Sequence, residues 1–167
     1  MTKINFLTPI KSHMGYAQMA RLVWPGLKSC GELGCRDLEI QSSAVNHGVA
    51  ANEMSALPAF ANPDITIINM IPPLWDRLRS PGLNVGYSTF EASRLPSAWT
   101  DIANKYDVCW TTSAWNKQVM IESGVKTPIH VISPVATGTV LDKLPPKGGK
   151  FRFLASFQWG ERKNVVG

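Results

Sequence analysis

A run of branched apolar residues at 64–71 constrains the fold of this chain more than any other segment. It reads Asp64-Ile65-Thr66-Ile67-Ile68-Asn69-Met70-Ile71, with apolar side chains at consecutive positions. Because successive side chains of a strand point to opposite faces of the sheet, this strand must be covered on both faces. Such strands are typical of parallel sheets with helices on each side, and Pro72-Pro73 ends this one.

Predicted strands alternate with helical segments along the chain, and no Asn-Gly or Asp-Gly pair indicates a hairpin. This order predicts parallel pairing through right-handed crossovers. The fold class is therefore α/β, a Rossmann-like parallel sheet with helices on both faces. The predicted strands are residues 2–8, 35–41, 64–71, 83–89, 107–112, 129–132 and 151–157.

The helices are predicted from apolar residues at helical spacing and from residues that begin or end a helix. The first begins near Tyr16, and we expect Pro25-Gly26 to stop or kink it. Pro96 starts another, whose apolar face carries Trp99, Ile102, Ala103 and Tyr106. Ser113 is a predicted N-cap for residues 115–123, and Gly124 is placed to end that helix. Residues 42–62 are weakly patterned and predict a loop with one short helix.

Length and composition predict a globular protein. The chain has 167 residues, of which 44% are hydrophobic and 17% charged. It contains no apolar run of about 18 residues, so no transmembrane helix is expected. No basic and apolar signal opens the chain, which favours a cytoplasmic location, with peripheral membrane association left open. Cys30, Cys35 and Cys109 lack metal-ligand spacing, and we expect unpaired thiols.

The net charge of +5 is concentrated near the C-terminus. Residues 143–163 hold six basic residues and one acid, and the rest of the chain is balanced. A neutral domain body disfavours a nucleic-acid surface. We expect a solvated linker for most of this basic segment, which comprises Lys143, Lys147, Lys150, Arg152, Arg162 and Lys163.

The segment 86–99 predicts a ligand site. It runs from an apolar strand through Phe90, Glu91 and Arg94 into the helix that Pro96 starts. An aromatic ring, a carboxylate and a guanidinium thus follow the carboxyl end of a predicted buried strand. In open α/β sheets, ligands bind at the carboxyl ends of the strands.

Three segments in order resemble the group 1 (family 4) glycosyltransferases. They are residues 86–99, reading GYSTFEASRLPSAW; residues 107–125, which include DVCWTTS, WNKQV and SGV; and residues 151–164, reading FRFLASFQWGERKN. The resemblance covers about residues 83–164. One departure is residues 134–139, reading PVATGT, where the family has P-x-G-V-D. We carry no function onto that turn.

The resemblance implies a retaining hexosyltransferase of the GT-B fold, active in carbohydrate biosynthesis. Such an enzyme moves a sugar from a nucleotide-diphosphate donor to an acceptor hydroxyl and needs neither metal nor cofactor. Residues 1–142 would be a Rossmann-like acceptor-side domain, 143–150 a linker and 151–167 the start of a truncated donor-binding domain. The implied partners are a glycan acceptor and the missing donor domain. The chain alone is expected to be inactive, and its exposed inter-domain face could form a homodimer.

Glu91 is the catalytic candidate that the resemblance implies, since a carboxylate there can hydrogen-bond sugar hydroxyls or hold Arg94 near the reacting sugar. The alternative is a Glu91–Arg94 ion pair that only braces the loop. The predicted acceptor-binding residues are His13, Gly15, Tyr16, Phe90 and Arg94. Gly15 allows close backbone approach at a helix N-terminus, although it can also be a simple turn glycine. For His13, an exposed loop position is favoured over a catalytic base.

The resemblance implies that Arg162 and Lys163 bind the donor diphosphate, since Lys163 aligns with the family's diphosphate-binding residue. Two adjacent cations could also stabilise a departing nucleoside diphosphate. The alternative is two solvated charges. Five tryptophans are expected to pack in or near the core: Trp24, Trp75, Trp99, Trp110 and Trp115. Trp75, which follows Pro72-Pro73-Leu74, is the one that could stack on a sugar.

Other function classes stay open. The glycine fingerprint of a dinucleotide site is missing, which argues against a dehydrogenase. A sugar-nucleotide epimerase-like GT-B protein and a non-catalytic Rossmann-like binding module remain alternatives.

Overall fold

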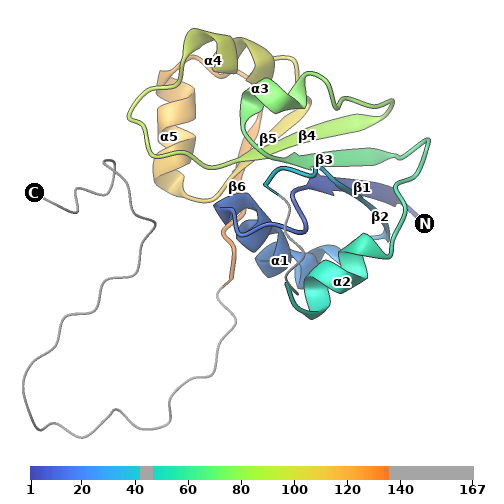
Figure 1. Ribbon diagram of the computed structural model, residues 1–167. Coiled ribbons are helices and arrows are strands. Elements are labelled where there is room, and N and C mark those ends of the chain that lie inside the picture. The colour runs from blue at the N-terminus through green and yellow to red at the C-terminus, as the bar shows by residue number, and fades with distance from the viewer. Residues whose placement is uncertain (42–46, 136–167) are drawn as a thin grey trace, which may run out of the picture. The chain divides into compact units, whose positions relative to one another are not determined.

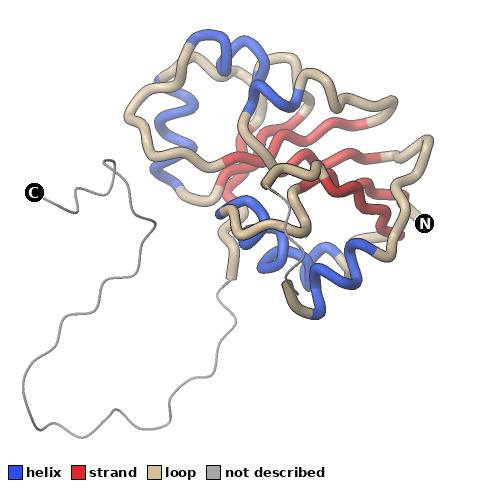
Figure 2. The backbone as a smooth tube through the Cα atoms, in the orientation of Figure 1, coloured by secondary structure: helices blue, strands red, loops and turns tan. Residues whose placement is uncertain are grey.

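The computed structural model describes residues 1–41 and 47–135, which form a six-stranded sheet with five helices (Figures 1 and 2). All neighbouring strands are parallel, in the order β2-β1-β3-β4-β5-β6. The strands are β1 (Lys3–Thr8), β2 (Glu32–Asp37), β3 (Ile65–Asn69), β4 (Leu83–Ser88), β5 (Val108–Thr111) and β6 (Ile129–Val131). The helices are α1 (Gly15–Leu27), α2 (Val49–Ser55), α3 (Pro72–Trp75), α4 (Ser97–Ala103) and α5 (Ala114–Glu122).

Helices cover both faces of the sheet, as predicted. Figure 1 shows α1 and α2 on one face and α3, α4 and α5 on the other. The consecutive apolar residues of β3 divide between the two faces, since Ile67 joins the core under α1 and α2 while Ile68 joins the opposite core. Both are buried, which explains why β3 reads as a continuous apolar run.

The strand order reverses between β1 and β3. From β1 the chain moves outward to β2, then returns to place β3 on the other side of β1 and continues to β6. Such a switch point opens a crevice at the carboxyl ends of the two strands, because the loops that follow them diverge. The loop after β1 and the end of β3 at Asn69 therefore flank the expected ligand position.

The second strand differs from its prediction. It spans Glu32–Asp37 rather than residues 35–41, and Asp37 is its last residue paired with β1. The backbone then leaves the sheet, with Glu39 and Gln41 at φ 54° and 50°. These left-handed conformations cannot extend a strand. The sequence pattern gives no sign of them, so the prediction continued the strand too far.

The helix ends match the predicted signals at α5 more closely than at α1. The Ser113 hydroxyl accepts a hydrogen bond from the Asn116 amide at 3.1 Å, which is an N-cap. Gly124 has φ 95°, and the amides of Gly124 and Val125 donate to the carbonyls of Ile121 and Met120. These two bonds form a Schellman motif. By contrast, α1 continues past Pro25 to Leu27, since a proline in the last turn removes only one bond from the helix.

Trp75 does not stack on a ligand, because it lies wholly inside the protein. Its side chain is 0% exposed and its indole N–H donates to the Met70 carbonyl at 2.7 Å. Gly86 of β4 lies beneath the ring, and a Cβ at that position would overlap it. The prediction that Trp75 could stack on a sugar is wrong, because Gly86 leaves space for its ring inside the core.

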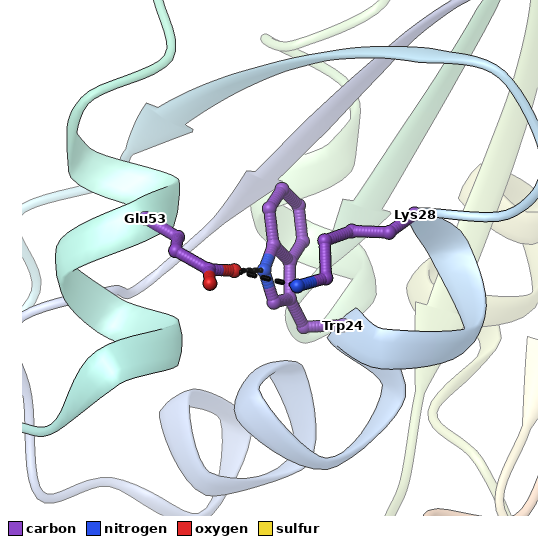
Figure 3. A network of polar contacts seen from close by, with 3 residues as sticks. All are labelled: Trp24, Lys28 and Glu53. Atoms are coloured by element: carbon purple, nitrogen blue, oxygen red, sulfur yellow. Dashed lines mark hydrogen bonds and ion pairs between the residues drawn. The ribbon is translucent and has the colours of Figure 1, made fainter.

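Helices α1 and α2 are joined by a polar cluster of Trp24, Lys28 and Glu53 (Figure 3). One Glu53 carboxylate oxygen accepts from the Trp24 indole N–H at 2.7 Å and from the Lys28 ammonium at 2.9 Å. The two donors hold the pKa of Glu53 below its ordinary value, and Lys28 has the larger effect. The same three residues border a cavity of about 640 Å³ that also touches Phe60.

Several predictions concern residues outside the part of the chain that the structure describes. They are the domain boundary after residue 142, the linker 143–150, the strand 151–157 and the donor ligands Arg162 and Lys163. Among the described helices, none is long and apolar enough to span a bilayer.

Candidate functional site

The candidate site lies at the carboxyl end of the sheet, the end where β1, β3, β4 and β5 all finish. His13 comes from the loop between β1 and α1, and Gly15 is the first residue of α1. The loop after β4 contributes Phe90, Glu91 and Arg94. Because the strands are parallel, segments about 75 residues apart in the sequence come to one end of the molecule.

Tyr16 connects the first turn of α1 to the end of β4. Its phenol donates to the Thr89 carbonyl at 2.7 Å and lies 2.9 Å from the Ser88 hydroxyl, which must then be the donor in that pair. The ring is buried, and this burial raises the pKa of the phenol. Tyr16 therefore holds the Gly15 turn beside the loop that carries Glu91.

Asn69, at the end of β3, links the end of β1 to the start of α1 at the switch point. Its amide N–H₂ donates to the Thr8 hydroxyl and to the Tyr16 carbonyl, both at 2.8 Å. The side chain is fully buried, and its carbonyl oxygen accepts no hydrogen bond from the described residues. Sequence reasoning missed Asn69, although a lone amide within the apolar run 64–71 was an available signal.

The loop between β1 and α1 is shaped by Arg21 and Asp37. The Arg21 guanidinium donates to the carbonyls of Ile10 and Ser12 at 3.0 and 3.3 to 3.4 Å. The Asp37 carboxylate accepts from the amides of Ile10 and Lys11 at 3.0 and 3.3 Å. Since both charged groups are committed to the loop's backbone, the loop has a defined shape before any ligand binds.

His13, in this loop, and Gly15, just after it, are both exposed. Gly15 is the first residue of α1, and open space surrounds the position where its Cβ would lie. The fold therefore does not need a glycine there, which leaves room beside the backbone. The His13 ring lies edge-on to His47, with ring centroids 4.7 Å apart. Desolvation lowers the pKa of His47, and the charges of His13 and Arg21 lower it further. The Asp37 carboxylate acts in the opposite direction and raises it.

Asn116 of α5 fixes the loop after β4 by a hydrogen bond to its backbone. Its N–H₂ group donates to the Phe90 carbonyl at 2.7 Å, and its carbonyl oxygen accepts from the Ser113 hydroxyl at 3.0 Å. The hydroxyls of Thr89 and Thr112 lie 2.9 Å apart beside it. Asn116 is 3% exposed and was not predicted, because nothing in the sequence pairs it with Phe90.

Glu91 and Arg94 extend this loop into solvent, and both are exposed. Glu91 lies at the same end of the sheet as Gly15, which is the placement that its proposed role requires. Phe90 is half-buried, and its ring centroid lies 6.3 Å from that of Trp115 in α5. Trp115 is 51% exposed, in contrast to the packed position expected for it. The functional roles of these residues stay predictions.

The described residues hold no group of three or more His, Cys, Asp or Glu side chains able to bind a metal ion. The amino-acid sequence matches no protein-family model, and no curated protein matches it.

Proposed function

We propose that this chain forms the acceptor-side domain of a retaining glycosyltransferase, which moves a sugar from a nucleotide-diphosphate donor to an acceptor hydroxyl. One observation carries the proposal. Tyr16 brings the open Gly15 turn and the Phe90–Glu91 loop to one end of the sheet. The resemblance over residues 83–164 also supports it, since Phe90, Glu91 and Arg94 lie within the first of the three similar segments.

The chemistry of this end suits a carbohydrate. An exposed carboxylate accepts hydrogen bonds from sugar hydroxyls, and Arg94 supplies donors to ring or hydroxyl oxygens. Gly15 leaves space for a sugar beside the backbone at the N-terminus of α1, where the amides carry partial positive charge. Glu91 would orient the acceptor hydroxyl in the transferase, and the donor-binding domain would supply the donor.

The test is glycan binding to the chain by ligand-observed saturation-transfer NMR. We expect binding that Glu91→Gln weakens and that Gly15→Leu blocks, because the larger side chain fills the open space without disturbing the fold. Glu32→Gln is the matched control, since Glu32 is an exposed carboxylate at the first residue of β2, the opposite end of the sheet.

Two outcomes would count against the proposal. If no glycan in a broad panel binds the wild-type chain, the acceptor-side role is wrong. If the chain alone transfers sugar at a substantial rate, it is not half of an enzyme, because no donor-binding domain would then be needed.

A further inference from the structure

Trp115 is far more exposed than the buried tryptophans Trp24 and Trp75. Its side chain is 51% exposed at the second residue of α5, whereas Trp24 and Trp75 are 1% and 0% exposed. A single exposed apolar residue is ordinary on a protein surface. Trp115 differs because its ring is paired with a second aromatic ring, that of Phe90, at 6.3 Å and an interplanar angle of 46°.

The pair is held in place by hydrogen bonds of the buried Asn116. Asn116, the neighbour of Trp115, donates to the Phe90 carbonyl at 2.7 Å and is itself fixed by the Ser113 cap. The start of α5, which carries Trp115, is therefore hydrogen-bonded to the loop that carries Phe90. A binding surface that is ordered beforehand loses less entropy when a ligand binds.

We propose that Trp115 and Phe90 form a stacking platform for one pyranose ring of the acceptor glycan, beside Glu91. This inference rests on the proposed function and names the part of the site that selects the acceptor. A pyranose has an apolar C–H face and a rim of hydroxyls. The face packs on the rings, and the rim meets the carboxylate that follows Phe90 directly in the chain.

The size of the platform favours a sugar over a protein partner. A tryptophan side chain that is half exposed offers on the order of 100 Å² of surface, since such side chains bury 150–250 Å² in full. A stable protein interface needs roughly 800 Å² from each partner. One pyranose ring matches the smaller area.

The experiment follows the indole N–H signals of the ¹⁵N-tryptophan-labelled chain, which has six tryptophans. Trp115→Phe assigns the Trp115 signal. Methyl glucopyranosides, methyl galactopyranoside, methyl mannopyranoside and maltose are titrated in turn. At least one of these sugars is expected to shift the Trp115 signal to saturation, while the signals of the buried Trp24 and Trp75 stay in place.

Variants then measure the contribution of the ring. Trp115→Ala is expected to weaken binding of that sugar by about tenfold or more, as for an aromatic residue central to an interface. Trp115→Phe should retain most of the affinity, because it keeps an aromatic face. Ile121→Ala is the matched control, since Ile121 is a 47% exposed apolar residue near the other end of α5, and it should leave binding unchanged.

Several results would overturn the platform. If a sugar binds by saturation transfer while the Trp115 signal stays fixed, the platform is wrong and the proposed function stands. If no sugar binds by either measurement, both are wrong. A Trp115 shift produced by uridine and by none of the sugars would assign the rings to a nucleobase instead. A shift that depends on protein concentration alone would assign them to a second copy of the chain.

Discussion

At the scale of single residues, hydroxyl and amide groups at the strand ends decide how the candidate site is assembled. Tyr16 reaches from α1 to Ser88 and Thr89, and Asn116 reaches from α5 to Phe90. The sequence predicted Tyr16 as an acceptor-binding residue, because it lies in the turn after the first strand. Its buried phenol, which is engaged with β4, supports a positioning role, because both hydrogen-bonding directions of the hydroxyl are already used.

Tyr16→Phe is expected to lower the free energy of unfolding by about 1–2 kcal/mol, because it leaves the buried Ser88 hydroxyl and the partly buried Thr89 carbonyl without their partner. Urea denaturation measures the loss. Tyr106→Phe is the control, since it removes a similar buried bond, 2.6 Å long, to the Trp75 carbonyl. Only Tyr16→Phe should speed amide exchange at Thr89 and Phe90. Equal exchange in the two variants would show that Tyr16 does not position this loop.

At the scale of elements, α1 and α2 depend on side-chain contacts as much as on helix propensity. α2 has seven residues, which is too short to be stable alone, and α1 contains a proline and a glycine in its last turn. Trp24 of α1 and Lys28, the residue that caps the end of α1, meet Glu53 of α2, so the cluster connects two helices that flank β1 and β2 (Figure 3).

The Glu53 carboxylate makes this contact sensitive to pH. Its pKa is lowered in the folded protein from the ordinary 4.5, so the stabilisation is complete above that value and is lost as the pH falls through the folded pKa. Glu53→Gln should therefore lower the melting temperature at pH 7 and have progressively less effect below pH 4.5. Thermal unfolding followed by circular dichroism measures both. A variant that loses the same stability at every pH would contradict the ionic contribution.

At the scale of the whole described domain, two apolar cores share one sheet. Cys35 belongs to the core that α1 and α2 cover, and Cys109 belongs to the opposite core. Burial raises the pKa of each thiol to about 12. Cys30 is exposed, so the three unpaired thiols report separately on the surface and on each core.

Thiol labelling at neutral pH is expected to modify Cys30 quickly and the other two only on unfolding, because a buried thiol is both inaccessible and protonated. If the cores unfold together, Cys35 and Cys109 become reactive at the same urea concentration. Mass spectrometry after pulsed labelling locates each modification. Labelling of one buried thiol well before the other would show that the two faces of the sheet unfold independently.

The sequence alone determined the architecture and the position of the candidate loops. The apolar run 64–71 required cover on both faces, and the alternation of strands with helices required parallel pairing, so Glu91 had to follow a strand at its carboxyl end. These inferences depend only on local periodicity and chain order, which a sequence carries directly.

Only the tertiary structure decided which side chains meet. Trp75 is buried because Gly86, on a neighbouring strand segment, leaves room for its ring, and Trp115 is exposed because no described element covers the start of α5. Likewise, Asn69 and Asn116 find their partners in segments about 25 to 60 residues away. Contacts between distant segments depend on strand register and helix packing, and the residue pattern within any one segment holds no record of them.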